Sequence, residues 1–135
     1  NQPKQAAYMD VIMNFFNKVE NNESPIIRGD GSPTVDLVYA QDAAKACVLA
    51  MNKEISGEFF NVASGVETSL KELAYLIIEI CEKKGQISPI FDKEYDQGLV
   101  TRRLGCTKKA ERLLGFKTEI NPKMGLTLLY DWIKS

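Results

Sequence analysis

Residues 26–65 limit the possible folds more than any other part of the chain; they read IIRGDGSPTVDLVYAQDAAKACVLAMNKEISGEFFNVASG. Two short runs within them, residues 37–40 and 59–63, are rich in aromatic and β-branched side chains, as buried strands are. A helix between these runs would act as a crossover and leave the two strands parallel. Parallel strands normally lie inside larger sheets, and the sequence offers no third and fourth strand of equal quality. We therefore expect the chain to be part of a larger fold.

Composition names no partner for the chain. Its 135 residues suffice for one ordinary domain, and 17 basic against 18 acidic residues give a net charge of -1. This balance predicts no basic surface for nucleic acid. The longest apolar runs fall far short of the ~20 residues that span a bilayer, so we predict no membrane contact.

The cysteine and histidine counts exclude several kinds of site. There are three cysteines, no CxxC pair and no histidine, so neither a zinc site nor a Ser-His or Cys-His nucleophile can be built from this sequence. Cys47 and Cys81 lie in apolar helical stretches and are interpreted as small hydrophobic residues. An odd cysteine count favours a reducing cytoplasm. The opening NQPKQAAYMD has no signal-peptide pattern, and we expect it to lie within a longer polypeptide.

Apolar residues spaced near 3.6, together with capping signals, predict five helices. The second helix has Asp42 as its predicted N-cap, and Leu126 and Trp132 belong to the predicted buried stripe of the last helix. Short extended segments are expected at 26–28 and 89–91. The predicted helices cover residues 5–21, 43–53, 70–85, 107–114 and the segment from 122 onward, which follows an Asn-Pro start signal.

Two groups of polar residues deserve consideration as an active site, and both are rejected. Tyr130 and Lys134 have the Tyr-x-x-x-Lys spacing that brings a phenol and an ammonium onto one helical face, but no cofactor motif accompanies them. Asp30, Asp36 and Asp42 are interpreted as a turn, a strand-edge and a cap residue rather than an acid/base pair. The sequence has no G-x-G-x-x-G after a strand, so this chain alone is not expected to hold a dinucleotide.

Four motifs in register resemble one family. GDGSPTVDLVYAQDA at 29–43, FNVASG at 60–65, KAERLLGF at 109–116, and Gly125-Leu126 followed by Trp132 are similar to the C-terminal half of the extended short-chain dehydrogenase/reductases, the NAD-dependent nucleotide-sugar epimerases and dehydratases. The resemblance covers nearly the whole chain. It implies an α/β fold, the C-terminal part of an extended Rossmann-type enzyme, with mostly helices and a few short, partly parallel strands.

The resemblance also implies a division of labour. Residues 1–135 would be the substrate-binding portion, and an N-terminal Rossmann part of the same protein would bind NAD and carry the catalytic Ser and Tyr-x-x-x-Lys. In such enzymes NAD removes a hydride from the sugar ring, and the keto-sugar is then reduced again or loses water. This chain alone would be inactive, and the whole enzyme is expected to be a homodimer that binds a nucleotide-diphosphate sugar.

Candidate substrate-binding residues follow from the same resemblance. Ile26, Ile27 and Arg28 match the segment that lies beside the nucleotide base. Val35 and Asp96 stand where many members place arginines that hold the diphosphate, so both expected anion contacts are missing.

Arg102 and Arg103 are the natural replacements for these contacts, because each charge-assisted hydrogen bond to a diphosphate contributes roughly 1.5–3 kcal/mol. In an extended segment they point to opposite faces, so only one is expected to reach the pocket. The alternative is that they are solvated or pair with structural carboxylates.

Two other functions stay open. The chain could belong to a non-catalytic sensor of nucleotide sugars or dinucleotides, in which the lost arginines mean a lost substrate. It could also be a structural domain that oligomerises through open strands.

Overall fold

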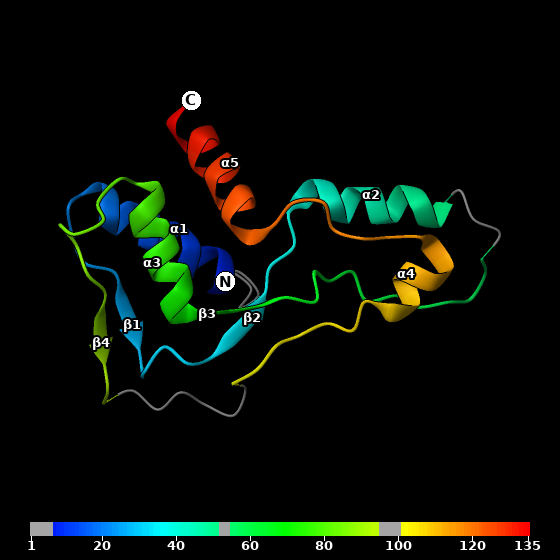
Figure 1. Cartoon of the computed structure of the whole chain (residues 1–135), viewed down its shortest axis with the longest axis horizontal. Coiled ribbons are helices and arrows are strands. Elements are labelled where there is room, and N and C mark those ends of the chain that lie inside the picture. Colours follow the sequence, from blue (N-terminus) through cyan, green and yellow to red (C-terminus); the bar gives the residue numbers. More distant parts are fainter. Residues whose placement is uncertain (1–6, 52–54, 95–100) are drawn as a thin grey trace, which may run out of the picture.

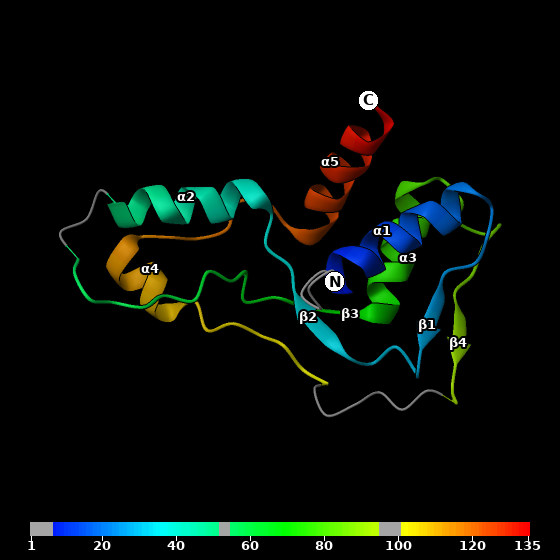
Figure 2. The ribbon, with the colours of Figure 1, turned by 180° about the vertical axis from the view of Figure 1, so that it is seen from behind.

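The computed structural model describes residues 7–51, 55–94 and 101–135, which form two lobes joined by extended segments (Figures 1 and 2). The larger lobe holds three helices and the strand pair β1 and β4, and the smaller lobe holds the other two helices of the described residues. Strands β2 and β3 lie where the lobes meet. The elements are α1 (Ala7–Glu20), β1 (Ile26–Arg28), β2 (Thr34–Asp36), α2 (Ala40–Met51), β3 (Glu67–Ser69), α3 (Leu70–Ile80), β4 (Ile90–Asp92), α4 (Lys108–Leu114) and α5 (Pro122–Lys134).

The core of the larger lobe is built by α1, α3 and α5. Helix α3 starts with a capping box, in which the backbone N–H of Glu72 donates to Ser69 Oγ at 3.1 Å and Glu72 Oε2 accepts from the Ser69 backbone at 2.8 Å. Helix α5 starts at Asn121, whose Oδ1 accepts from the Met124 backbone at 2.9 Å. Both predicted starts are confirmed. The buried residues include Phe15, Phe16, Val19, Ile27, Leu73, Ala74, Ile77, Ile78, Cys81 and Leu126.

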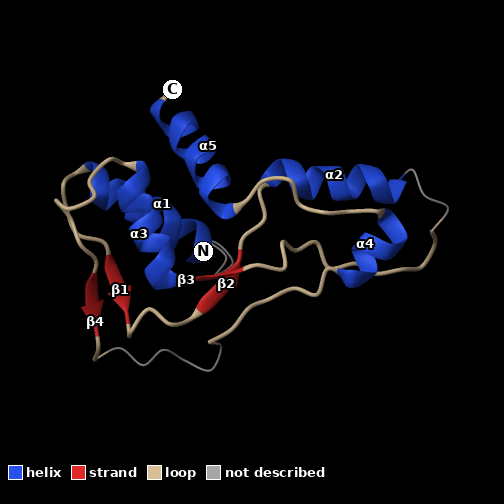
Figure 3. Ribbon diagram, in the orientation of Figure 1, coloured by secondary structure: helices blue, strands red, loops and turns tan. Residues whose placement is uncertain are grey.

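The described strands form two separate pairs (Figure 3). β1 and β4 are parallel, with Ile27 opposite Phe91. β2 and β3 are antiparallel, with Val35 opposite Thr68. The extended segment predicted at 26–28 is confirmed, and that predicted at 89–91 is found one residue later, at Ile90–Asp92.

The parallel pair predicted at 37–40 and 59–63 is wrong for this chain. Residues 37–39 and 59–63 are not strands, and α2 already begins at Ala40. A β-strand exists only where a neighbouring strand accepts its backbone hydrogen bonds, and the described residues provide no such neighbour for either run. Phe59, typical of a buried strand, is consequently 89% exposed.

Two further sequence predictions need correction. Trp132 is 73% exposed and does not belong to the buried stripe of α5, because the helix rests on α3 through residues on its other side. Helix α3 ends at Ile80 rather than near Gly85, because Glu82 adopts a positive φ of 58° that no α-helix continues through.

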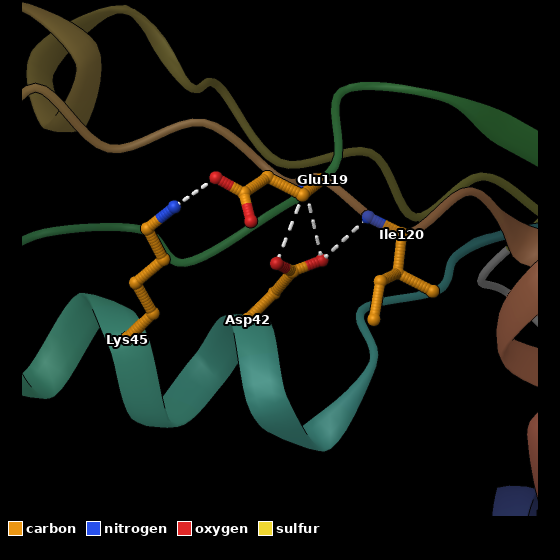
Figure 4. Close-up of polar contacts among 4 residues, drawn as sticks. All are labelled: Asp42, Lys45, Glu119 and Ile120. Carbon is orange, nitrogen blue, oxygen red and sulfur yellow. Dashed lines mark hydrogen bonds and ion pairs between the residues drawn. The ribbon is translucent and has the colours of Figure 1, made fainter.

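Asp42 joins α2 to the segment between α4 and α5. Its predicted role as the N-cap of α2 is wrong. It lies inside the first turn of α2, is only 2% exposed, and points at the segment between α4 and α5 (Figure 4). Its carboxylate accepts from the backbone N–H of Glu119 at 3.1 and 3.2 Å and from that of Ile120 at 3.1 Å. Lys45 and Glu119 form an ion pair beside it. The apolar core of this lobe consists of Ala46, Ala110, Leu114 and Phe116.

Candidate functional site

Asp36 organises the junction between the lobes. It ends β2, and its Oδ1 accepts from the backbone N–H and the hydroxyl of Ser64 at 2.8 and 2.5 Å. Its Oδ2 accepts from the backbone N–H groups of Gly65 and Gly105, at 3.0 and 3.2 Å. The carboxylate therefore holds together three passes of the chain. From the sequence alone Asp36 is predicted only as a strand-edge residue, because its partners are 28 to 69 positions away.

A cavity of about 660 Å³ lies directly beside this junction, and we call it the Arg103 hollow. Its volume falls in the range of small-molecule sites, about 300–1,000 Å³. Most of its wall is apolar, and Arg103 is the one basic side chain among its described lining residues. It is lined by Val35, Asp36, Leu37, Phe60, Asn61, Val62, Ala63, Arg103, Leu104 and Gly105.

Arg102 does not line the Arg103 hollow, because a carboxylate holds its guanidinium elsewhere. Arg102 Nε and one terminal nitrogen donate to the two oxygens of Glu67 at 2.7 and 2.8 Å. The Thr34 hydroxyl donates to Glu67 at 2.8 Å. Arg102, and then Thr34, lowers the pKa of Glu67 to about 2, so this carboxylate stays ionised at neutral pH. Arg102 thus has the structural ion pair that the sequence analysis kept as an alternative.

A second cavity, also about 660 Å³, contains three other candidates. We call it the Arg28 hollow; it lies between α1, β1 and the start of α3, and Ile26, Ile27 and Arg28 all line it together with Asn14 and Asp92. The structure therefore divides the predicted binding residues between two hollows, with Val35 and Arg103 in one and the β1 residues in the other. Asp96 lies outside the described residues.

Tyr130 and Lys134 are occupied by a structural contact. The Tyr130 hydroxyl donates to Glu20 Oε1 at 2.5 Å, and Lys134 forms an ion pair with the same carboxylate. The hydrogen bond to Glu20 stabilises the neutral phenol, so the pKa of Tyr130 is raised rather than lowered. This pair joins α5 to α1 and is poorly suited to accept a proton.

The described part of the chain shows neither a cluster of metal-binding side chains nor a helix able to traverse a bilayer. No group of three or more Cys, Asp or Glu residues there could hold a metal ion. No described helix is both long and apolar enough to cross a membrane.

Comparison with known proteins places the chain in a family. Residues 2–63 match the model of the NAD dependent epimerase/dehydratase family. A putative UDP-glucose 4-epimerase of Methanocaldococcus jannaschii is 41% identical over 125 residues, which cover 93% of this chain. The chain belongs to the NAD-dependent epimerase/dehydratase family. It spans only 39% of the length of that relative.

Solved epimerase structures share the fold. An epimerase from Methanothermobacter thermautotrophicus superimposes on 92% of this chain with a TM-score of 0.83 and 30% identity, and the match covers 37% of that protein. The UDP-glucose 4-epimerase of Thermotoga maritima, solved with UDP-glucose, gives a TM-score of 0.81 and 28% identity over 92% of this chain and 39% of its own. The predicted fold class is confirmed: this α/β chain, mostly helical with a few short strands, corresponds to part of a Rossmann-type epimerase/dehydratase.

Proposed function

We propose that residues 1–135 are the nucleotide-sugar recognition portion of an NAD-dependent epimerase/dehydratase whose N-terminal Rossmann part lies outside this chain. The supporting observation is the pair of apolar runs around 37–39 and 59–63. They have the composition of buried strands and line one hollow together through Leu37 and Phe60, yet they form no ladder among the described residues. Strands of a neighbouring sheet would provide hydrogen-bond partners for the backbone N–H and C=O groups of these two runs. The chain matches only 39% of the length of the Methanocaldococcus relative, which also supports a second part of the protein outside this chain.

NAD does not fit the residues of this chain. A dinucleotide is usually held by a glycine-rich turn between a strand and a helix, and this sequence has no G-x-G-x-x-G in such a position. The proposed contribution of the chain is therefore to bind and orient the sugar nucleotide. NAD, in the remaining part, would supply hydride transfer for oxidation and re-reduction, or for dehydration, of the sugar.

In this proposal the two hollows divide the substrate. The Arg103 hollow would receive the diphosphate and sugar, because its guanidinium can form charge-assisted hydrogen bonds to phosphate oxygens. The Arg28 hollow would receive the base through Ile26, Ile27 and Arg28. Val35 would form an apolar wall, and Arg102 would act only through its contact with Glu67.

Replacing Arg103 by alanine in the full-length protein should weaken binding of the nucleotide-diphosphate sugar at least about tenfold, or ~1.4 kcal/mol. The matched control is Arg102→Ala, which removes the same charge from the neighbouring residue. Because this change breaks only an exposed ion pair, the affinity for the nucleotide-diphosphate sugar should change by about twofold or less. Calorimetric titration measures both. Equal losses in the two variants would show that net charge, not the position of Arg103, matters.

The 135-residue chain without further sequence should show no binding of NAD by calorimetry, because it lacks the glycine-rich turn. The full-length protein is the positive control and should bind NAD. A saturable isotherm from the short chain would contradict the proposed division of labour.

Val35 favours a second candidate, a non-catalytic sensor. It is apolar and 7% exposed at a position where the resemblance implies a phosphate-binding arginine, and a sensor without that arginine would lack one contact to the diphosphate. Determining the sequence that precedes Asn1 would separate the two functions. A glycine-rich fingerprint together with a Tyr-x-x-x-Lys motif supports the enzyme. A glycine-rich fingerprint without a Tyr-x-x-x-Lys motif supports the sensor. The homodimer and the cytoplasmic location stay predictions.

A further inference from the structure

The Arg28 hollow contains one polar side chain to which neither the fold nor the sequence analysis assigns a role. Asn14 lies on the face of α1 that borders the hollow, together with Val11, Phe15 and Lys18. Phe15 is buried in the core of the larger lobe, so the backbone on which Asn14 stands is firmly placed. Asn14 itself is exposed to the hollow.

The neighbouring cations are already engaged. Lys18 Nζ lies 3.1 Å from Glu23 Oε2, and Arg28 also has an interaction partner. The side chain of Asn14, by contrast, makes no hydrogen bond to any residue in the described ranges. The Asn14 carboxamide could therefore bind a ligand without breaking a hydrogen bond within the described residues.

The hollow also offers apolar surface to the face of a flat ring. Ile26 and Leu70 line it with apolar side chains, and Asn14 lines it beside them. A carboxamide presents one donor and one acceptor side by side, Nδ2–H and Oδ1. Uracil, thymine and guanine each present the complementary pair, a ring N–H adjacent to a carbonyl oxygen. A ring resting on the apolar wall could direct this edge at Asn14.

We propose, resting on the function proposed above, that Asn14 hydrogen-bonds the N–H and carbonyl edge of the substrate base. Asn14 Oδ1 accepts from the ring N–H and Nδ2 donates to the adjacent carbonyl. The substrate class is thereby a diphosphate sugar of uridine, thymidine or guanosine. Asn14 is a specificity residue and takes no part in the chemical step.

Calorimetric titration of the full-length protein with UDP-glucose, dTDP-glucose and GDP-mannose identifies the ligand, and variants are then compared with the tightest of the three. Asn14→Ala should weaken it at least about tenfold, since a good bidentate contact to a base contributes that much or more. Asn14→Asp should lose as much, because a carboxylate accepts from the ring N–H but cannot donate to the carbonyl.

Asn17→Ala is the matched control, because it removes the same side chain from an exposed position of α1 outside the hollow. It should leave the affinity unchanged, and all three variants should unfold at the wild-type urea concentration. If the wild type binds none of the three nucleotides, the proposed function fails. If the wild type binds but Asn14→Ala binds equally well, only the role of Asn14 is overturned.

Discussion

Replacing Asp42 with alanine should lower the free energy of unfolding by about 2–4 kcal/mol. The carboxylate is 2% exposed and accepts from two backbone N–H groups, those of Glu119 and Ile120. Truncation leaves both groups without an acceptor in a place that water reaches poorly, and each such group costs about 1–3 kcal/mol. The segment between α4 and α5 would lose its attachment to α2.

Urea unfolding followed by circular dichroism measures this effect. Asp131→Ala, at an exposed position of α5, removes the same side chain and should shift the midpoint little. Asp42→Asn keeps one acceptor oxygen and should fall between the two. An Asp42→Ala midpoint equal to that of Asp131→Ala would refute the role assigned to this carboxylate.

Replacing Gly105 with alanine should be the other strongly destabilising change, by about 1–3 kcal/mol. A Cβ atom built on Gly105 would lie 2.2 Å from the Cβ of Ala63, which is too close for two non-bonded carbon atoms, so one of them would have to move. Residues 63–65 and 105 would have to separate, and the bond from the Gly105 N–H to Asp36 would be strained. Because this contact borders the Arg103 hollow, nucleotide-sugar affinity should fall as well.

A second substitution tests the steric cause. Ala63→Gly removes the opposing methyl group, so the double variant Ala63→Gly, Gly105→Ala should be more stable than the sum of the two single changes predicts. The four free energies of unfolding form a double-mutant cycle. Simple additivity would mean that the two residues do not meet as described.

Local features of the sequence were enough to predict where α3 and α5 begin and where α4 ends. Ser69 and Glu72 are three residues apart, Asn121 precedes Pro122, and Gly115 ends α4 at a φ of 70°. Each of these signals depends on residues within one turn of its own helix, so the surrounding tertiary structure has little effect on where that helix begins or ends. The family resemblance was equally accessible, because its motifs are short and contiguous.

Pairings between distant residues could not be predicted in this way. The runs at 37–40 and 59–63 have strand composition, but whether a strand forms depends on a hydrogen-bonding neighbour, which the described chain does not give them. Arg102 and Arg103 are adjacent in sequence, but Glu67, 35 positions from Arg102, holds Arg102 in an ion pair, whereas Arg103 lines the hollow named after it.

The starts and ends of helices could thus be predicted from neighbouring residues, whereas the long-range contacts of two carboxylates could not. The sequence alone makes Asp36 look like a strand-edge residue and Asp42 like a helix cap. In the structure Asp36 joins β2 to residues 64, 65 and 105, and Asp42 joins α2 to residues 119 and 120. A helix cap is satisfied by backbone groups a few residues away, so its pattern is legible in the sequence. A buried carboxylate accepts whichever backbone N–H groups the folded chain brings within 3 Å, and only the tertiary structure decides which those are.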